Sequence, residues 1–149
     1  MEKIYRSRYR IRFGDCDCAG IVFHPKAFQM TNTTTEDWFR KVLDTPFESM
    51  LSLGFLFPIV HIECDFLAQM HVGDEIVKEL AVKRVGTSSL EISIDFFRGS
   101  EKTFSCREVM VCIDVGTRRS KPIPEGLRTK LLSLLTDQTG SSEKSALNG

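Results

Sequence analysis

Residues 12–25 read Arg-Phe-Gly-Asp-Cys-Asp-Cys-Ala-Gly-Ile-Val-Phe-His-Pro. Glycines 14 and 20 bracket the polar middle of this stretch, and a short apolar run follows the second glycine. His24-Pro25 is typical of a helix start, because proline suits the first turn of a helix and holds the residue before it in an extended conformation. The stretch therefore predicts the end of a strand, a special loop and the start of a helix.

The residues before this stretch alternate in character. Tyr5, Tyr9, Ile11 and Phe13 share one parity, and Arg6, Arg8, Arg10 and Arg12 share the other. A period of two with aromatic and β-branched residues predicts a half-exposed strand over residues 4–13. The arginine stripe is interpreted as a charged outer face that discourages association at the sheet edge, with phosphate binding as the alternative.

The residues after the stretch predict a helix over 25–43. Phe28, Thr31, Thr35, Trp38 or Phe39, and Val42 form one face at a spacing of 3.6 residues. Residues 31–35, Thr-Asn-Thr-Thr-Thr, have poor helix propensity, so burial must hold the middle of this helix. Threonine hydroxyls can bond the carbonyl four residues earlier, which allows such a helix to be buried.

The rest of the chain predicts four strands and a short helix. Strand patterns cover residues 60–68, 75–85, 89–96 and 109–113, with turns between them. A last amphipathic helix follows Pro122 and Pro124. We expect an α+β domain over residues 1–135, in which a five-stranded antiparallel sheet packs on one long helix, and a disordered tail over 136–149.

Composition narrows the class of protein. The 149 residues carry 20 Lys+Arg and 20 Asp+Glu, and this zero net charge argues against a dedicated nucleic-acid binder. No run approaches the roughly 20 apolar residues of a membrane span, and the first residues lack a secretory signal, so we expect a cytoplasmic protein with no membrane partner. The five cysteines are an odd number without a disulfide pattern, which predicts reduced thiols.

The loop of the opening stretch is the candidate for chemistry. Asp15 and Asp17 are two residues apart, so in an extended chain they point to the same side. A carboxylate beside glycines and before a helix start suits catalysis, because the unpaired amides there, on His24 and Lys26, can stabilise an oxyanion. The alternative is that both aspartates merely cap a turn or the helix.

Residues 12–25 resemble the signature of the 4-hydroxybenzoyl-CoA thioesterase family of hot-dog folds, which runs from phenylalanine-glycine-aspartate to tyrosine or histidine and then proline. Similarity extends over most of residues 5–132, through the strand and turn at 66–74, the turn at 85–89 and the tail at 122–125. In that fold a sheet wraps one long helix, as the order of predicted elements requires.

The resemblance implies an acyl-CoA thioesterase whose substrate is an aromatic or a short to medium aliphatic acyl-CoA. Asp17 matches the family's nucleophile or general base, and the amide of His24 matches its oxyanion donor. Some relatives bind the phosphates of coenzyme A with a basic cluster at the turn that corresponds to residues 83–88. This turn has fewer charges in a shifted position, and the candidate residues for binding coenzyme A are Lys83, Arg84, Thr87 and Ser88. The resemblance also implies a homodimer or homotetramer with the active site between subunits. We expect no separate cofactor, since coenzyme A is part of the substrate, and no metal.

Other interpretations remain open. Asp15 is expected to shape the loop by hydrogen bonds to backbone amides. Cys16, Cys18 and His24 could bind a metal, although a fourth ligand is missing, or a cysteine could act as nucleophile with His24 as base. Glu36 or Asp37 on the long helix could carry the catalytic carboxylate. The same fold could also serve as a non-catalytic acyl-CoA-binding module, a thioesterase for acyl carrier protein, or a hydratase.

Overall fold

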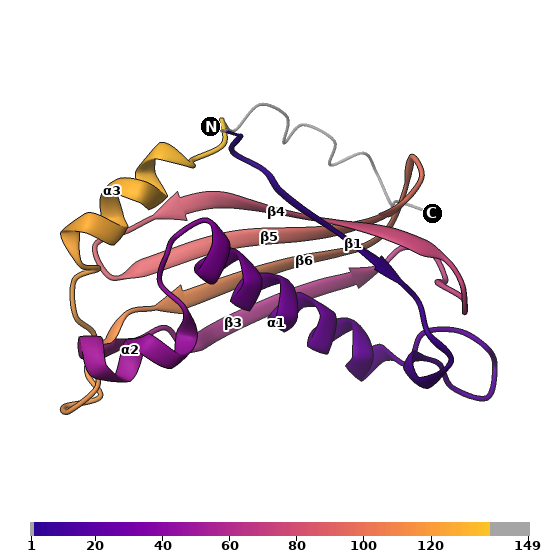
Figure 1. Cartoon of the computed structure of the whole chain (residues 1–149), viewed down its shortest axis with the longest axis horizontal. Coiled ribbons are helices and arrows are strands. Elements are labelled where there is room, and N and C mark those ends of the chain that lie inside the picture. Colours follow the sequence, from indigo (N-terminus) through magenta and orange to yellow (C-terminus); the bar gives the residue numbers. More distant parts are fainter. Residues whose placement is uncertain (1, 138–149) are drawn as a thin grey trace, which may run out of the picture.

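The computed structural model describes residues 2–137 (Figure 1). In chain order its elements are β1 (Tyr5–Arg10), the 3-10 helix η1 (Phe13–Asp15), α1 (His24–Lys41), α2 (Phe47–Leu53), β2 (Phe55–Leu56), β3 (Ile59–Phe66), β4 (Glu75–Val85), β5 (Ser89–Arg98), β6 (Glu101–Val111), β7 (Ile113–Asp114) and α3 (Glu125–Ser133).

Five strands form one antiparallel sheet in the order β1-β4-β5-β6-β3. The long helix α1 lies across one face of this sheet (Figure 1). The core between them includes Trp38 and Phe39 from α1 and alternate apolar residues of β5 such as Ile92 and Ile94. The predicted α+β architecture, with one long helix on a five-stranded antiparallel sheet and a short helix at the end, is confirmed.

Two details differ from the sequence prediction. The first strand ends at Arg10, and residues 13–15 form a 3-10 turn instead of continuing the strand. Helix α2 was not predicted, because seven residues are too few to show a helical period. It is held by packing, since Met50 is buried and the ring of Phe47 lies 5.1 Å from the ring of Phe39.

The threonine-rich middle of α1 is buried, as predicted. Thr31, Thr34 and Thr35 are each about 1% exposed. Their hydroxyls bond back along the helix: Thr34 donates to the carbonyl of Met30 at 2.7 Å, and Thr35 donates to that of Thr31 at 3.0 Å. The helix can therefore lie on the sheet without orphaned hydroxyl donors.

Glu108 of β6 is an unexpected buried carboxyl in this core. It is 1% exposed, and Oε2 has no hydrogen-bond partner within residues 2–137. Its Oε1 accepts the thiol of Cys106 at 3.8 Å. Burial raises the pKa of Glu108, and the nearby Thr31 hydroxyl and Cys106 thiol lower it only in part.

This buried carboxyl should make stability fall with rising pH. Above its ordinary pKa of 4.5 the unfolded chain ionises Glu108 while the folded chain keeps it protonated, which costs the fold up to about 1.4 kcal/mol per pH unit until the folded pKa is reached. We expect Glu108→Gln to gain stability relative to wild type between pH 4.5 and 7.5 in urea unfolding. The exposed Glu36→Gln serves as control, and parallel curves for all three proteins would contradict this.

Helix α3 closes the end of the sheet opposite the loop of residues 13–23 (Figure 1). Lys130 donates to the carbonyl of Leu43 at 3.0 Å, just beyond the end of α1. Thr136, the first residue of the expected tail, bonds the carbonyl of Val82 through its amide and its hydroxyl. Residues 138–149 of that tail lie outside the described residues.

A helix that spans a membrane needs about 20 mostly apolar residues. Within residues 2–137, no helix is long and apolar enough to span a membrane.

Candidate active site

Residues 15–23 form a small hairpin in front of α1. Asp17 donates its amide to the carbonyl of Ile21 at 3.0 Å, and Phe23 donates its amide to the carbonyl of Asp15 at 2.9 Å. The turn is closed by the bond from the Gly20 amide to the Asp17 carbonyl, also 3.0 Å. Gly20 has a φ of +76°, the left-handed conformation with which a three-residue hairpin loop ends. The glycine is therefore required by the turn.

Asp17 lies in the turn of this hairpin and is exposed. Its Oδ1 accepts the amide of Ala19 at 2.8 Å, which fixes the direction of the carboxylate. Within the described part of the chain, no donor is bonded to Oδ2. One oxygen is thus held by the loop, and the other is available to a water molecule or a substrate.

His24 is the first residue of α1, directly after the returning arm of the hairpin. Pro25 has no N–H, and the amide of Lys26 already bonds the carbonyl of Phe23 at 2.8 Å. The expectation that Lys26 offers a free amide is therefore wrong, because the first turn of the helix uses it. Among residues 2–137 the His24 amide has no acceptor, so the positive end of α1 presents this donor next to the hairpin.

Asp15 has a different environment from Asp17. It is 9% exposed, and its Oδ2 accepts both the hydroxyl of Tyr9 at 2.6 Å and the amide of Arg12 at 2.8 Å. Burial, followed by the hydrogen bond to Asp15, raises the pKa of Tyr9 to about 12. The expected structural role of Asp15 is confirmed: it ties the 3-10 turn to β1.

A second set of hydrogen bonds holds the segment beside the hairpin, and the sequence did not predict it. Arg98 of β5 donates to the carbonyl of Gln69 at 2.8 Å and to Oδ2 of Asp74 at 2.7 Å. Burial alone would raise the pKa of Asp74, but hydrogen bonds from the His71 amide and Arg98 lower it overall. The amide of Val22 donates to Met70 in this segment at 2.8 Å. No local pattern marks Arg98, because its partners come from a distant turn.

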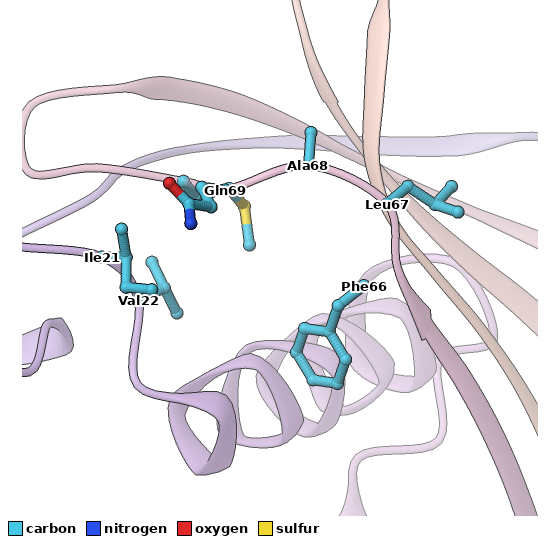
Figure 2. Close-up of a pocket in the computed structure, with 7 residues that line it drawn as sticks. Ile21, Val22, Phe66, Leu67, Ala68 and Gln69 are labelled. Atoms are coloured by element: carbon cyan, nitrogen blue, oxygen red, sulfur yellow. The ribbon is translucent and has the colours of Figure 1, made fainter. Parts of the chain in front are cut away.

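A cavity of about 240 Å³ lies between the hairpin and the segment that follows β3 (Figure 2). Its apolar lining comes from Ile21, Val22, Phe66, Leu67, Ala68 and Met70. Gln69 supplies the polar side chain. One of its walls, Ile21, accepts the amide of Asp17 across the hairpin, so the cavity is the candidate site for an apolar group attached to a reacting carbonyl.

Five aromatic residues that could contact an acyl group divide into two groups by their exposure. Trp38, Phe55 and Phe57 are core residues, at most 8% exposed, whereas Phe23 and Phe28 reach the surface. Phe66 was not singled out from the sequence, yet it lines the cavity and packs edge-on against Phe28 at 6.4 Å between ring centres. Strand order decided which rings reach the cavity.

The candidate residues for binding coenzyme A lie far from Asp17 within one chain. Lys83, Arg84, Thr87 and Ser88 surround the turn after β4, beside α3, and β4 starts near the hairpin end (Figure 1). Its eleven residues span about 33 Å at the usual rise of a strand. The structure therefore places Asp17 in the hairpin and His24 directly after it, and leaves these four residues at the opposite end of the sheet.

The other candidate groups do not gather into a site. All five cysteines are free, and Cys18 is exposed because it lies in the hairpin turn. Within residues 2–137, no three side chains of His, Cys, Asp or Glu cluster as metal ligands. Arg6 and Arg10 of the basic stripe pair with Glu79 and Glu75 across β1 and β4, as a charged outer face would.

Comparison with known families agrees with this geometry. A model of the thioesterase-like superfamily matches residues 11–131, which include the hairpin, α1 and strands β3 to β6 of the sheet. The chain belongs to this superfamily. Membership confirms the resemblance read from residues 12–25, the hot-dog fold and the expected class of enzyme, a thioester hydrolase.

Individual relatives within the superfamily are distant. The chain is 25% identical over 134 residues to the 1,4-dihydroxy-2-naphthoyl-CoA hydrolase of Nostoc punctiforme, covering 90% of each chain. It is 29% identical over 125 residues to the enzyme of the same name from Prochlorococcus marinus, covering 78% of this chain and 80% of the relative. The solved 1,4-dihydroxy-2-naphthoyl-CoA thioesterase of Synechocystis superposes with a TM-score of 0.80 at 22% identity, covering 88% and 97%, which supports the fold.

Proposed function

We propose that the protein is an acyl-CoA thioesterase that hydrolyses an aromatic acyl-CoA to the free acid and coenzyme A. The observation that carries the proposal is one hairpin that presents an exposed carboxylate, Asp17, beside the free amide of His24 and an apolar cavity. A thioester carbonyl placed there would have a base or nucleophile near its carbon and a donor near its oxygen.

The roles follow from the charges that change during hydrolysis. Asp17 either takes a proton from the water that adds to the carbonyl, or adds itself and forms an anhydride that water then opens. In both routes the carbonyl oxygen gains negative charge, which the His24 amide and the positive end of α1 stabilise. Collapse of this first intermediate breaks the C–S bond, and coenzyme A leaves as a thiolate that takes up a proton. In the second route this step forms the anhydride, which water opens afterwards. Coenzyme A is therefore substrate, and the scheme uses no separate cofactor.

The choice of an aromatic acyl group rests on two observations. The named relatives act on 1,4-dihydroxy-2-naphthoyl-CoA. The cavity beside Asp17 has an apolar lining with Phe66 at one side, and a flat ring gains from packing against such a surface. An aliphatic acyl group is the less favoured alternative.

We test the proposal by the release of free coenzyme A thiol from benzoyl-, naphthoyl-, short aliphatic and long aliphatic acyl-CoA. Fastest turnover of an aromatic thioester is the expected result. Binding of a non-hydrolysable analogue without any turnover would instead favour the acyl-CoA-binding module. Turnover of acyl carrier protein thioesters alone would move the assignment to that carrier.

The edge strand β3 supports a second proposal, that two copies pair along it. Within residues 2–137, β3 pairs with a strand on one side only. Its side chains include three exposed apolar residues, Ile59 (42%), Val60 (60%) and Ile62 (41%). An apolar open edge of this kind favours pairing with another chain. A second copy could then also bring Lys83 and Arg84 toward the first copy's site, where they could hold the phosphates of coenzyme A.

Light scattering at micromolar concentration is expected to give at least twice the chain mass of 16.9 kDa. Val60→Asp should shift the protein toward the monomer, because it places a charge at the paired edge. Leu132→Asp is the matched control, since Leu132 is 44% exposed on α3, which packs near β4 and not near β3. A monomeric wild type would contradict the proposal.

A further inference from the structure

Gln69 stands out in the cavity beside the hairpin, because the other six lining residues are apolar. Figure 2 shows its side-chain amide on the same side of the cavity as Ile21, the residue that pairs with Asp17 across the hairpin. Ligand sites of this type combine an apolar surface with a few placed polar groups that fix the orientation of the ligand. The amide is therefore placed to meet a polar substituent on the group that fills the cavity.

The backbone of Gln69 is held in place from both sides. Its carbonyl accepts the guanidinium of Arg98 at 2.8 Å, and Arg98 is itself paired with Asp74 at 2.7 Å. The next residue, Met70, is 4% exposed and accepts the amide of Val22 at 2.8 Å. The backbone that carries the Gln69 side chain is therefore fixed beside the cavity, as a residue that discriminates between substrates requires.

We propose that Gln69 is a specificity-determining residue whose amide hydrogen-bonds a hydroxyl group on the aromatic ring of the acyl substrate. The inference rests on the proposed function and adds the residue that recognises the substituent on the ring. A primary amide both donates and accepts, so it matches a hydroxyl, which also does both. Being uncharged, it gives no ion pair to a ring carboxylate or ammonium, which makes a neutral hydroxyl the fitting substituent.

The expected preference is moderate. A fully buried site that bonds a substrate hydroxyl rejects the analogue lacking it by about 10⁴-fold or more, because its polar groups are left unpaired. Gln69 is exposed at the side of the cavity, so water can satisfy its amide when the hydroxyl is missing. We therefore expect kcat/KM to favour the hydroxylated ring about tenfold, the value of one ordinary hydrogen bond.

The test compares benzoyl-CoA with its 2-, 3- and 4-hydroxy derivatives. Wild type is expected to favour at least one hydroxylated ring about tenfold, and Gln69→Leu to lose that preference while still hydrolysing benzoyl-CoA. Gln29→Leu is the control, because Gln29 is exposed on α1 and does not line the cavity. A wild type without preference, or an unchanged preference in Gln69→Leu, overturns the inference and leaves the proposed function intact.

A binding experiment separates this inference from the proposed function. In phenacyl-CoA and hydroxyphenacyl-CoA a methylene stands between the carbonyl carbon and the sulfur, so there is no thioester to hydrolyse and calorimetry measures affinity without turnover. Tighter binding of the hydroxylated compound that Gln69→Leu abolishes supports the inference even if no thioester is hydrolysed. Equal affinity of the two compounds for wild type and for Gln69→Leu overturns it.

Discussion

Asp17→Asn is expected to lower kcat for the best acyl-CoA on the order of 10²–10⁴-fold, the usual loss when a positioned base or nucleophile is removed. The change is nearly isosteric, and the asparagine oxygen can still accept the Ala19 amide that orients Asp17 at 2.8 Å. The hairpin should therefore persist, and KM should change much less than kcat. Release of coenzyme A thiol by the two proteins side by side measures the effect.

Asp37→Asn and Glu36→Gln are the matched controls for this prediction. Both side chains lie on α1, which was the alternative place for the catalytic carboxylate. Asp37 forms an ion pair with Lys41, with 3.8 Å between the nitrogen and the carboxylate oxygen. Each variant should retain near wild-type turnover. Near-normal kcat in Asp17→Asn, or a collapse in either control, would falsify the assignment of Asp17.

Asp15→Ala is expected to have the largest effect on stability. It removes the acceptor of two hydrogen bonds, from Tyr9 and from the amide of Arg12, and leaves both donors without a partner. Losses of this kind add to about 3 kcal/mol in the free energy of unfolding, or a fall of about 6–12 °C in Tm for a chain of this length. Turnover should fall as well, because the side chain of Asp15 holds the 3-10 turn from which the hairpin starts.

Tyr9→Phe isolates one of these bonds. It removes only the hydroxyl, and Asp15 keeps the amide of Arg12, so a loss of about 1–2 kcal/mol is expected. Tyr5→Phe is the control, because Tyr5 lies on the same face of β1, is half-buried and makes no side-chain hydrogen bond within residues 2–137. Thermal unfolding of the three variants compares them directly. Equal Tm values for Tyr9→Phe and Tyr5→Phe would contradict the role given to the Tyr9–Asp15 bond.

Much of the fold could be predicted because its signals are local. The alternation of β4 covers residues 75–85 as expected, and Pro25 marked the start of α1 to within one residue. The buried threonines of α1 could be anticipated from the reach of their hydroxyls to the preceding turn. Helix α2 could not, since seven residues carry no period and only packing against Phe39 holds them.

The candidate site was predicted in part. Asp17 and the His24 amide are close in sequence, and one hairpin joins them, so a motif sufficed to propose both. The cavity could not be found in this way, because its walls come from residues 21–22 and 66–70. Gln69 belongs to the second wall and Arg98 holds its backbone, and neither residue shows a motif of its own.

The sequence by itself determined the order of elements, the helix start and the candidate carboxylate, because side-chain period, proline and glycine act over a few residues. Only the tertiary structure decided that Asp15 is buried while Asp17 is exposed, that Glu108 lies under α1, and that Lys83 lies at the far end of the sheet. These facts depend on strand order and register, which join residues distant in the chain. Parity along one strand tells which side chains share a face, but not what covers that face.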